Sequence, residues 1–182
     1  SSKVVGLPEG DGHGHDHDDA HADDDHDDHD HEDEHSHGES GEILLHAARS
    51  NYVGVFGPHE VHDHPDEGEG VFYLNSRVRF RDVKDGLSKT IFVGERSSRL
   101  GYSTWPGVIE GVAANMERVV GSTDHTPNSP EQHFDDFSSH HPTGAHFLLG
   151  DGAVLLLSDD VDEEIYRALS TRKGSDVSFS EE

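Results

Sequence analysis

Histidine and carboxylate side chains are concentrated in one stretch near the start of the chain. Between residues 11 and 39 the sequence holds nine of the chain's 18 His residues and 14 of its 39 acidic residues. Carboxylate oxygens suit Ca²⁺, whereas imidazoles suit Zn²⁺, Cu²⁺ and Ni²⁺. Because Asp and Glu outnumber His, the composition predicts a divalent-metal site, with Ca²⁺ favoured and Zn²⁺ second. The predicted ligands are His13, His15, Asp16, His17, Asp18, Asp19, His21, Asp23, Asp24, Asp25, His26, Asp27, Asp28, His29, Asp30, His31, Glu32, Asp33, Glu34, His35 and His37.

Two interpretations of this stretch stay open. Its composition cannot bury enough apolar surface to offset chain entropy, which predicts a solvated tail that buffers metal loosely. Alternatively, bound ions or a basic neighbouring subunit hold it in place, because repelling carboxylates need counter-charge at close range. We favour the second interpretation. In an extended chain, alternate residues such as His29 and His31 would then share one face and one row of ions.

Two patterns resemble catalytic motifs, and neither supports an enzyme. Residues His31 to His35, reading HEDEH, match the H-E-x-x-H sequence of zinc proteases, but no apolar helix is predicted there to present both imidazoles. Residues Ser138 to His141 follow Asp135 and Asp136, yet no nucleophile elbow or oxyanion-hole signature accompanies them. We therefore expect no catalytic activity.

Seven further candidate metal ligands lie outside the acidic stretch. They are His59, His62, His64, Asp85, Glu95, His141 and Asp151. Each also has an interpretation without metal. His59, His62 and His64 can be exposed loop residues. Asp85 and Glu95 can cap a turn or pair with Arg96. His141 and Asp151, together with His140 and His146, can share hydrogen bonds that hold a hairpin.

The overall composition restricts the partners of this chain. The formal net charge is −26 and the hydrophobic fraction is 30%. Such a charge disfavours nucleic acid and anionic membrane surfaces and favours cations. The chain has no Cys, which excludes disulfides, and no apolar run approaches the roughly 20 residues that span a bilayer. It starts without Met or a signal-peptide pattern, so we expect a processed or trimmed product.

The clearest structural unit predicted from the sequence lies near the C-terminus. Apolar runs at 145–149 and 153–157 predict two strands, and Asp151-Gly152 between them predicts a two-residue type I′ turn. Asp160 and Glu163 then predict a capping box at the start of a helix. This hairpin and helix would form the centre of a small domain.

Strands are also predicted for most of the preceding part. Apolar runs or alternation occur at 51–57, 71–74, 77–81, 91–95, 105–112 and 116–120. In the predicted strand at 77–81, the basic outer face would consist of Arg77, Arg79 and Arg81. That face is the best docking surface for the acidic tail of the same or the next molecule. Local pairing with acidic neighbours is an equally open alternative.

Several of these segments together resemble a known family. They are NYVGVFG at 51–57, GVFYLNS at 70–76, DGxSxTIxVGE at 85–95 and SxHPxGA at 139–145, with nine residues between His141 and Asp151-Gly152. They resemble the C-terminal half of the planctomycete family of prepilin-type, pseudopilin-like proteins with a His-x9-Asp-Gly box, a domain of unknown function. The resemblance covers roughly residues 47–176. It implies an exported protein with a pilin-like head, a role in extracellular filaments or secretion machinery, and no known catalysis.

The sequence therefore predicts an α+β protein in three parts. A pilin-like antiparallel β-sheet head with a C-terminal helix would occupy 43–176, after an extended tail without regular secondary structure at 1–42 and before a short end at 177–182. We expect an extracellular filament subunit, whose copies are bridged by divalent ions bound to the tail. In the resembling family a long apolar helix precedes the head, so here the tail would replace it. The alternatives are a monomeric secreted or surface metal-sequestering protein and a minor pseudopilin of a secretion system.

Overall fold

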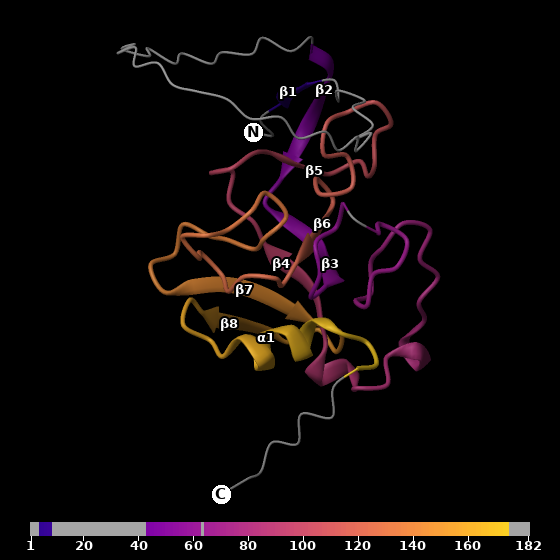
Figure 1. Ribbon diagram of the computed structural model, residues 1–182, viewed down its shortest axis with the longest axis vertical. Coiled ribbons are helices and arrows are strands. Elements are labelled where there is room, and N and C mark those ends of the chain that lie inside the picture. The colour runs from indigo at the N-terminus through magenta and orange to yellow at the C-terminus, as the bar shows by residue number, and fades with distance from the viewer. Residues whose placement is uncertain (1–3, 9–42, 63, 175–182) are drawn as a thin grey trace, which may run out of the picture.

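The computed structural model describes residues 4–8, 43–62 and 64–174, which form two β-sheets and one short α-helix (Figure 1). This arrangement confirms the predicted α+β class. The metal ligands predicted between residues 13 and 37, and the end at 177–182, lie outside the described residues. Within the described part, no helix is long and apolar enough to cross a membrane.

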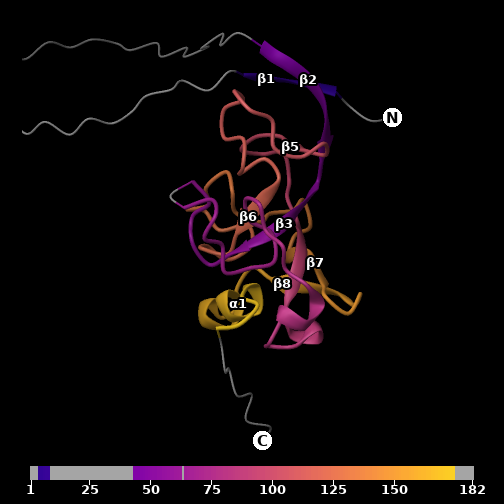
Figure 2. The ribbon, with the colours of Figure 1, turned by 90° about the vertical axis from the view of Figure 1, so that its right-hand side faces the viewer.

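In the smaller sheet, a strand from the start of the chain pairs with a strand that precedes the larger sheet in the sequence. Its strands are β1 (Val4–Pro8), β2 (Ile43–Ser50) and β5 (Ser103–Thr104), in the order β1-β2-β5 and with antiparallel pairing. The β1–β2 pair lies at the end of the molecule opposite the helix (Figures 1 and 2). The prediction that residues 1–42 lack regular structure is therefore wrong at Val4–Pro8, where β-branched and apolar residues suit a strand.

The larger sheet forms the body of the head. It contains β3 (Tyr52–Gly57), β4 (Ile91–Glu95), β6 (Val120–Ser122), β7 (Gly144–Leu149) and β8 (Val154–Ser158), in the order β6-β3-β4-β7-β8. The β3–β4, β4–β7 and β7–β8 pairs are antiparallel, as predicted, but β3 pairs with β6 in parallel. The sheet is therefore mixed rather than antiparallel throughout.

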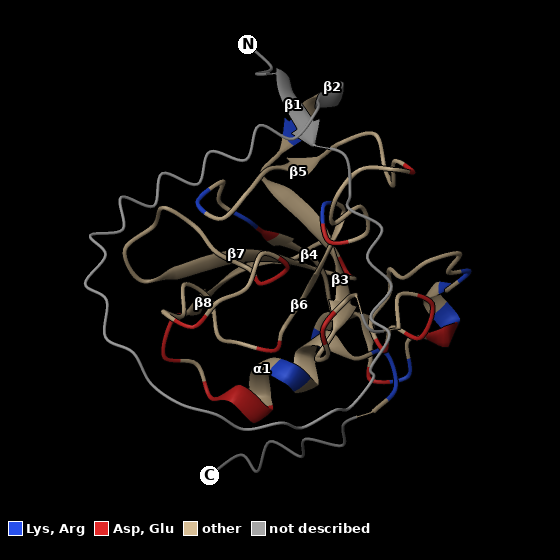
Figure 3. Cartoon of the chain, turned by 45° about the horizontal axis from the view of Figure 1, so that its top comes forward, with Lys and Arg blue, Asp and Glu red and all other residues tan. Residues whose placement is uncertain are grey.

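The helix α1 (Glu163–Ser170) begins two residues later than the sequence pattern predicted. Its N-cap is Asp162, whose side chain accepts a hydrogen bond of 3.0 Å from the N–H of Ile165. Asp160 instead accepts a hydrogen bond from the Ser158 hydroxyl. Figure 3 shows acidic residues in the first turn of α1 and a basic residue in its last turn, an arrangement that complements the helix dipole.

One face of the larger sheet is covered by α1. The fully buried Tyr166 side chain inserts between the helix and the sheet, with its ring centroid 5.8 Å from that of Phe147. The other buried members of this core are Val53, Val55, Ile91, Phe137, Ala145 and Leu149. Because successive strand residues point to opposite faces, the neighbours of Phe147 along β7 point away from α1. Those neighbours, His146 and Leu148, are partly exposed.

The hydroxyl of Tyr166 allows a stability prediction. It is buried without a hydrogen-bond partner among the described residues, and burial raises the pKa of Tyr166 well above its ordinary value. Since an unpaired buried hydroxyl is unfavourable, Tyr166→Phe is expected to raise the free energy of unfolding by about 1 kcal/mol. Urea denaturation followed by circular dichroism measures this, with Tyr52→Phe, at a half-exposed ring, as the control. A destabilised Tyr166→Phe protein would mean that the hydroxyl has a partner.

The β7–β8 hairpin is confirmed, but its turn differs from the predicted one. Leu149 and Ala153 are hydrogen-bonded across the turn, so the loop has three residues, Gly150 to Gly152. Within this loop positive φ is confined to Gly152, at +92°, whereas a type I′ turn requires it at two positions. The side chain of Asp151 accepts a hydrogen bond of 2.9 Å from the N–H of Ala153 and holds the turn.

Sequence alternation overestimated the strands outside this sheet. The predictions at 51–57 and 91–95 are confirmed by β3 and β4. Most of residues 71–81 and 105–119 is instead irregular, apart from the 3₁₀ turn η1 (Phe80–Asp82); a second such turn, η2 (Leu87–Lys89), precedes β4. Gly70 and Phe72 donate single hydrogen bonds to β3 carbonyls without forming a ladder. Arg77 and Arg79 are therefore exposed on a loop and Arg81 is exposed in η1, so none of them lies on a strand.

Candidate metal centre

Adjacent strands of the larger sheet bring Glu95 and His146 together. Glu95 is the last residue of β4, and His146 is the third of β7. In the β4–β7 register Gly94 lies opposite Phe147, which places the next pair, Glu95 and His146, opposite each other. Both side chains lie on the face away from α1, because Phe147 occupies the face toward it.

A tight loop before β7 brings His141 to the same place. The Ser139 hydroxyl donates a hydrogen bond of 2.7 Å to the Gly144 carbonyl and accepts one of 2.8 Å from the His141 N–H. At Gly144, a Cβ atom would lie 1.9 Å from the Leu157 carbonyl oxygen, so only glycine fits where the loop joins β7. The loop is further fixed to β4 by the Ser138 N–H, which donates to the Glu95 carbonyl.

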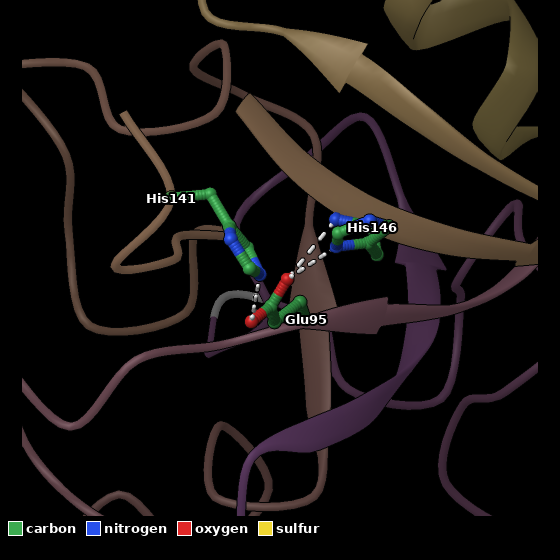
Figure 4. Close-up of side chains that lie close together, drawn as sticks. All are labelled: Glu95, His141 and His146. Atoms are coloured by element: carbon green, nitrogen blue, oxygen red, sulfur yellow. Dashed lines mark hydrogen bonds and ion pairs between the residues drawn. The ribbon is translucent and has the colours of Figure 1, made fainter. Parts of the chain in front are cut away.

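The carboxylate of Glu95 lies between the two imidazoles (Figure 4). Its Oε1 is 3.6 Å from His141 Nε2, and its Oε2 is 3.2 Å from His146 Nδ1. The two imidazole rings are 4.8 Å apart between centroids and 80° to each other. Glu95 is 15% exposed, His146 38% and His141 52%, so the group is reachable from solvent on one side.

These three side chains have the composition and spacing of a three-ligand zinc centre. The ligand atoms all lie within 4.8 Å of one another. Zn–N and Zn–O bonds of about 2.0 to 2.2 Å in a tetrahedral site separate neighbouring ligand atoms by about 3.4 Å. The distance of 3.2 Å from Oε2 to His146 Nδ1 and that of 3.6 Å from Oε1 to His141 Nε2, one from each oxygen of the carboxylate, bracket that value. A His₂Glu set leaves the fourth position of the ion open to water or to another ligand.

The imidazoles also form one wall of an apolar cleft. The cleft has a volume of about 470 Å³, and Tyr52, Val93, Leu148 and Val154 line it together with the two His residues. An ion held by Glu95 would therefore have polar ligands on one side and an apolar surface on the other.

The sequence predicted Glu95 and His141 as ligands, and the structure brings these two together. His146 was predicted only as a hydrogen-bonding group of the hairpin, although it is the third member of the cluster. The suggested pairing of Glu95 with Arg96 is not observed, because the Arg96 guanidinium donates to backbone carbonyls of other loops. The signal that the sequence lacked was the β4–β7 register.

The other predicted head ligands occupy separate places. His59 lies 3.6 Å from Glu69, and His62 lies 3.4 Å from Glu60, so these imidazoles have different carboxylate partners. His64 lines a pocket together with His59. Among the described residues, the three belong to no common ligand group. As metal ligands they stay predictions.

The remaining two predicted ligands contribute to turns. Asp85 accepts hydrogen bonds from the Thr171 hydroxyl and the Gly174 N–H, which ties the end of α1 to the loop before β4. Asp151 holds the β7–β8 turn. Each carboxylate thus has a structural role, and the structure places neither of them in the Glu95 cluster.

A second group of potential ligands was not predicted at all. Asp124, His125 and His133 each place one ligand atom within 4.8 Å of the others. His125 and His133 lie eight residues apart in irregular segments, so no local pattern relates them. Only the tertiary structure could have identified this group.

Comparison with protein-family models assigns the chain to a family. Residues 17–164 match the model described as "Protein of unknown function (DUF1559)", and since this is most of the chain, the chain belongs to that family. No curated protein and no solved structure matches the chain. The predicted membership of a family of unknown function is therefore confirmed, and the relation to pseudopilins stays a prediction.

Proposed function

Starting from membership of this family, we propose that the chain is a divalent-metal-binding protein. Its head would hold one transition-metal ion, with Zn²⁺ as the first candidate, between Glu95, His141 and His146. The observation that carries the proposal is the position of the Glu95 carboxylate, 3.2 and 3.6 Å from two imidazoles on different elements. Two nitrogen ligands favour zinc over calcium at this place, because calcium prefers oxygen ligands.

The acidic stretch at 11–39 would have a complementary role. It carries 14 carboxylates and nine imidazoles without a Lys or Arg, which favours many weak sites for divalent ions. Carboxylates predominate there, so calcium is the first candidate for the tail. A protein with such a tail and a more selective head would collect ions and retain one.

An ion in the head would also act as a cross-link. Glu95 belongs to β4, His146 to β7 and His141 to the loop between β6 and β7. An ion that binds only the folded head stabilises it in proportion to the logarithm of its concentration over its dissociation constant. Such a metal cross-link would stabilise a chain that has no Cys and therefore no disulfide cross-links.

Filament assembly is the second candidate function, and one observation favours it. Tyr52, Leu148, Val154 and Leu156 are 55%, 37%, 65% and 47% exposed. Leu148 lies on β7, and Val154 and Leu156 lie on β8, which is an edge strand. An uncovered apolar sheet face and an edge strand are typical of surfaces that pack against another chain. In a pseudopilin-like head this face would receive an apolar helix or a second subunit, at the cell surface or outside the cell.

A zinc titration of the full-length protein tests the metal-binding proposal. After metal is removed with a chelator, Zn²⁺ is added while the histidine ring signals are followed by ¹H–¹³C NMR. The signals of His141 and His146 are expected to shift together and to saturate at one ion per head. Metal binding requires neutral imidazoles, so the same shifts are expected to need more zinc at pH 5 than at pH 7.

The neighbouring His140 provides the control for this titration. It is exposed and lies outside the ligand cluster, so His140→Gln should leave the shifts of the other two rings unchanged. If the rings of His141 and His146 do not respond when the tail histidines are saturated, the head does not bind zinc. Light scattering on the same samples distinguishes the two functions, because only a filament subunit gains mass as ions are added.

A further inference from the structure

The segment after β6 contains a second group of potential metal ligands, none of which belongs to the Glu95 cluster. Asp124 and His125 follow β6 closely, and His133 lies in the irregular segment between His125 and β7. One ligand atom from each of the three lies within 4.8 Å of the others. The two imidazole rings are 4.9 Å apart between centroids and 77° to each other, much like the pair beside Glu95.

Each of these imidazoles has a carboxylate partner. Asp136 Oδ2 lies 3.0 Å from His125 Nδ1, and Glu60 Oε1 lies 3.2 Å from His133 Nδ1. An ionised carboxylate can only accept a hydrogen bond, so the bond between Asp136 and His125 places the proton of His125 on Nδ1 and the lone pair of its neutral ring on Nε2. Metal-binding histidines commonly have such a carboxylate partner, which sets the tautomer and the ring orientation.

The buried Asp136 also fixes the two histidines relative to each other. Its side chain is 1% exposed, and the oxygen that contacts His125 accepts a second hydrogen bond, of 2.6 Å, from the backbone N–H of His133. The other oxygen accepts a hydrogen bond from the Ser122 hydroxyl at the end of β6. The positions of both imidazoles therefore depend on one immobile carboxylate.

The third ligand is oriented by α1. Arg167 Nη2 donates to the Asp124 carbonyl at 2.8 Å and lies 3.3 Å from Asp124 Oδ1. Asp124 Oδ2 lies 3.6 Å from His125 Nδ1, the nitrogen that also contacts Asp136, and Asp124 has a ligand atom within 4.8 Å of one on each histidine. The charge of Arg167 disfavours a cation here, but the carboxylates of the adjacent pocket compensate for it.

That pocket lies beside the ligand group and has a volume of about 420 Å³. Asp124 lines it together with the carboxylates of Glu60, Glu67 and Glu69, and with His59 and His64. A cleft lined by charges of one sign concentrates counter-ions within it. Divalent cations should therefore accumulate next to Asp124.

We infer that Asp124, His125 and His133 form a second site for a divalent transition-metal ion, with Zn²⁺ as the first candidate. Glu60 and Asp136 are its positioning residues, and the acidic pocket is the route by which the ion arrives. The site shares no residue with the Glu95 cluster, although His141 follows further along the same β6–β7 connection. A substitution of a ligand in one site therefore removes no ligand from the other.

The test uses the full-length protein with the Glu95→Gln substitution, so that failure of the head centre cannot affect the result. During a titration with Zn²⁺ alone, the ring signals of His125 and His133 are expected to shift together. Adding His133→Gln should lower the zinc affinity reported by the His125 ring by at least about tenfold. His133 is half-exposed, so this substitution should leave the fold intact.

His46 provides the matched control, because it is exposed on β2 and belongs to neither cluster. With His46→Gln the response of the His125 ring should be unchanged. The inference is overturned if the rings of His125 and His133 keep their frequencies at a zinc concentration that saturates the tail. It is also overturned if His133→Gln leaves the titration of His125 unaltered, since the cluster would then be only structural.

Discussion

Replacing Glu95 by glutamine is expected to lower the affinity of the head centre for zinc by roughly 100-fold or more. Substitutions of residues that merely orient a ligand cost about 10- to 100-fold, and Glu95 is the only carboxylate in its cluster. Glutamine keeps the size of the side chain but removes its charge and turns an NH₂ group toward one imidazole. The rings of His141 and His146 report the loss in a zinc titration followed by NMR.

The fold of the Glu95→Gln protein should be almost unaffected without metal. The glutamine oxygen can still accept the hydrogen bond of 3.2 Å that the backbone N–H of His146 donates to Glu95. The free energy of unfolding should therefore change by less than about 1 kcal/mol. Glu164→Gln, on the exposed first turn of α1, removes the same charge elsewhere and should leave zinc binding unchanged. Equal zinc affinities for the wild type and Glu95→Gln would exclude the carboxylate as a ligand.

The second large effect is expected at Arg96, the residue after Glu95. Its side chain is 2% exposed, and burial lowers its pKa to about 10, so it remains charged at neutral pH. The guanidinium donates to the carbonyls of Asp136, Val120, Glu117 and Asp135, which come from the two segments around the second ligand group. Arg96 therefore connects β4 to the loops on which that group depends.

Arg96→Met is expected to reduce the free energy of unfolding by about 4 kcal/mol or more. Methionine fills part of the volume, but it leaves several buried carbonyls without a donor, and each costs about 1 to 3 kcal/mol. Because domains of this size have only about 5 to 15 kcal/mol of stability, the protein would be close to unfolding. Urea denaturation followed by circular dichroism measures the change.

Two further variants make the Arg96 prediction specific. Arg96→Lys keeps the charge but cannot reach all the carbonyls, so it should fall between the wild type and Arg96→Met. Arg99→Met changes an exposed arginine three residues away and should cost less than about 0.5 kcal/mol. If Arg96→Met unfolds at the same urea concentration as Arg99→Met, the guanidinium is not the connection described.

The parts of the fold that could be predicted are those set by local pattern. β4 was predicted at residues 91–95, and the strands of the β7–β8 hairpin were predicted close to their observed bounds. The following helix was also predicted, although it begins two residues later. The segment at 71–74 has the same β-branched and aromatic composition as a strand, yet it donates a single hydrogen bond to β3, from the N–H of Phe72. Alternation identifies a half-buried segment but does not show whether a neighbour is available to pair with it.

The candidate site was predicted only in part for a similar reason. Glu95 and His141 are 46 positions apart, and nothing in the sequence indicates that β4 pairs with β7 in the register that sets Glu95 opposite His146. A shift of one residue in that register would move His146 to the face covered by α1. Residue types therefore suggested the ligands, whereas the sheet topology decided which of them meet.

The central claim is that an ion lies between Glu95, His141 and His146. Crystals of the full-length protein grown with zinc, measured on both sides of the zinc absorption edge, test it most directly. The account predicts an anomalous peak within about 2.2 Å of a Glu95 oxygen and of one nitrogen on each imidazole. Zinc peaks elsewhere on the protein, with hydrogen bonds alone joining these three side chains, would contradict it.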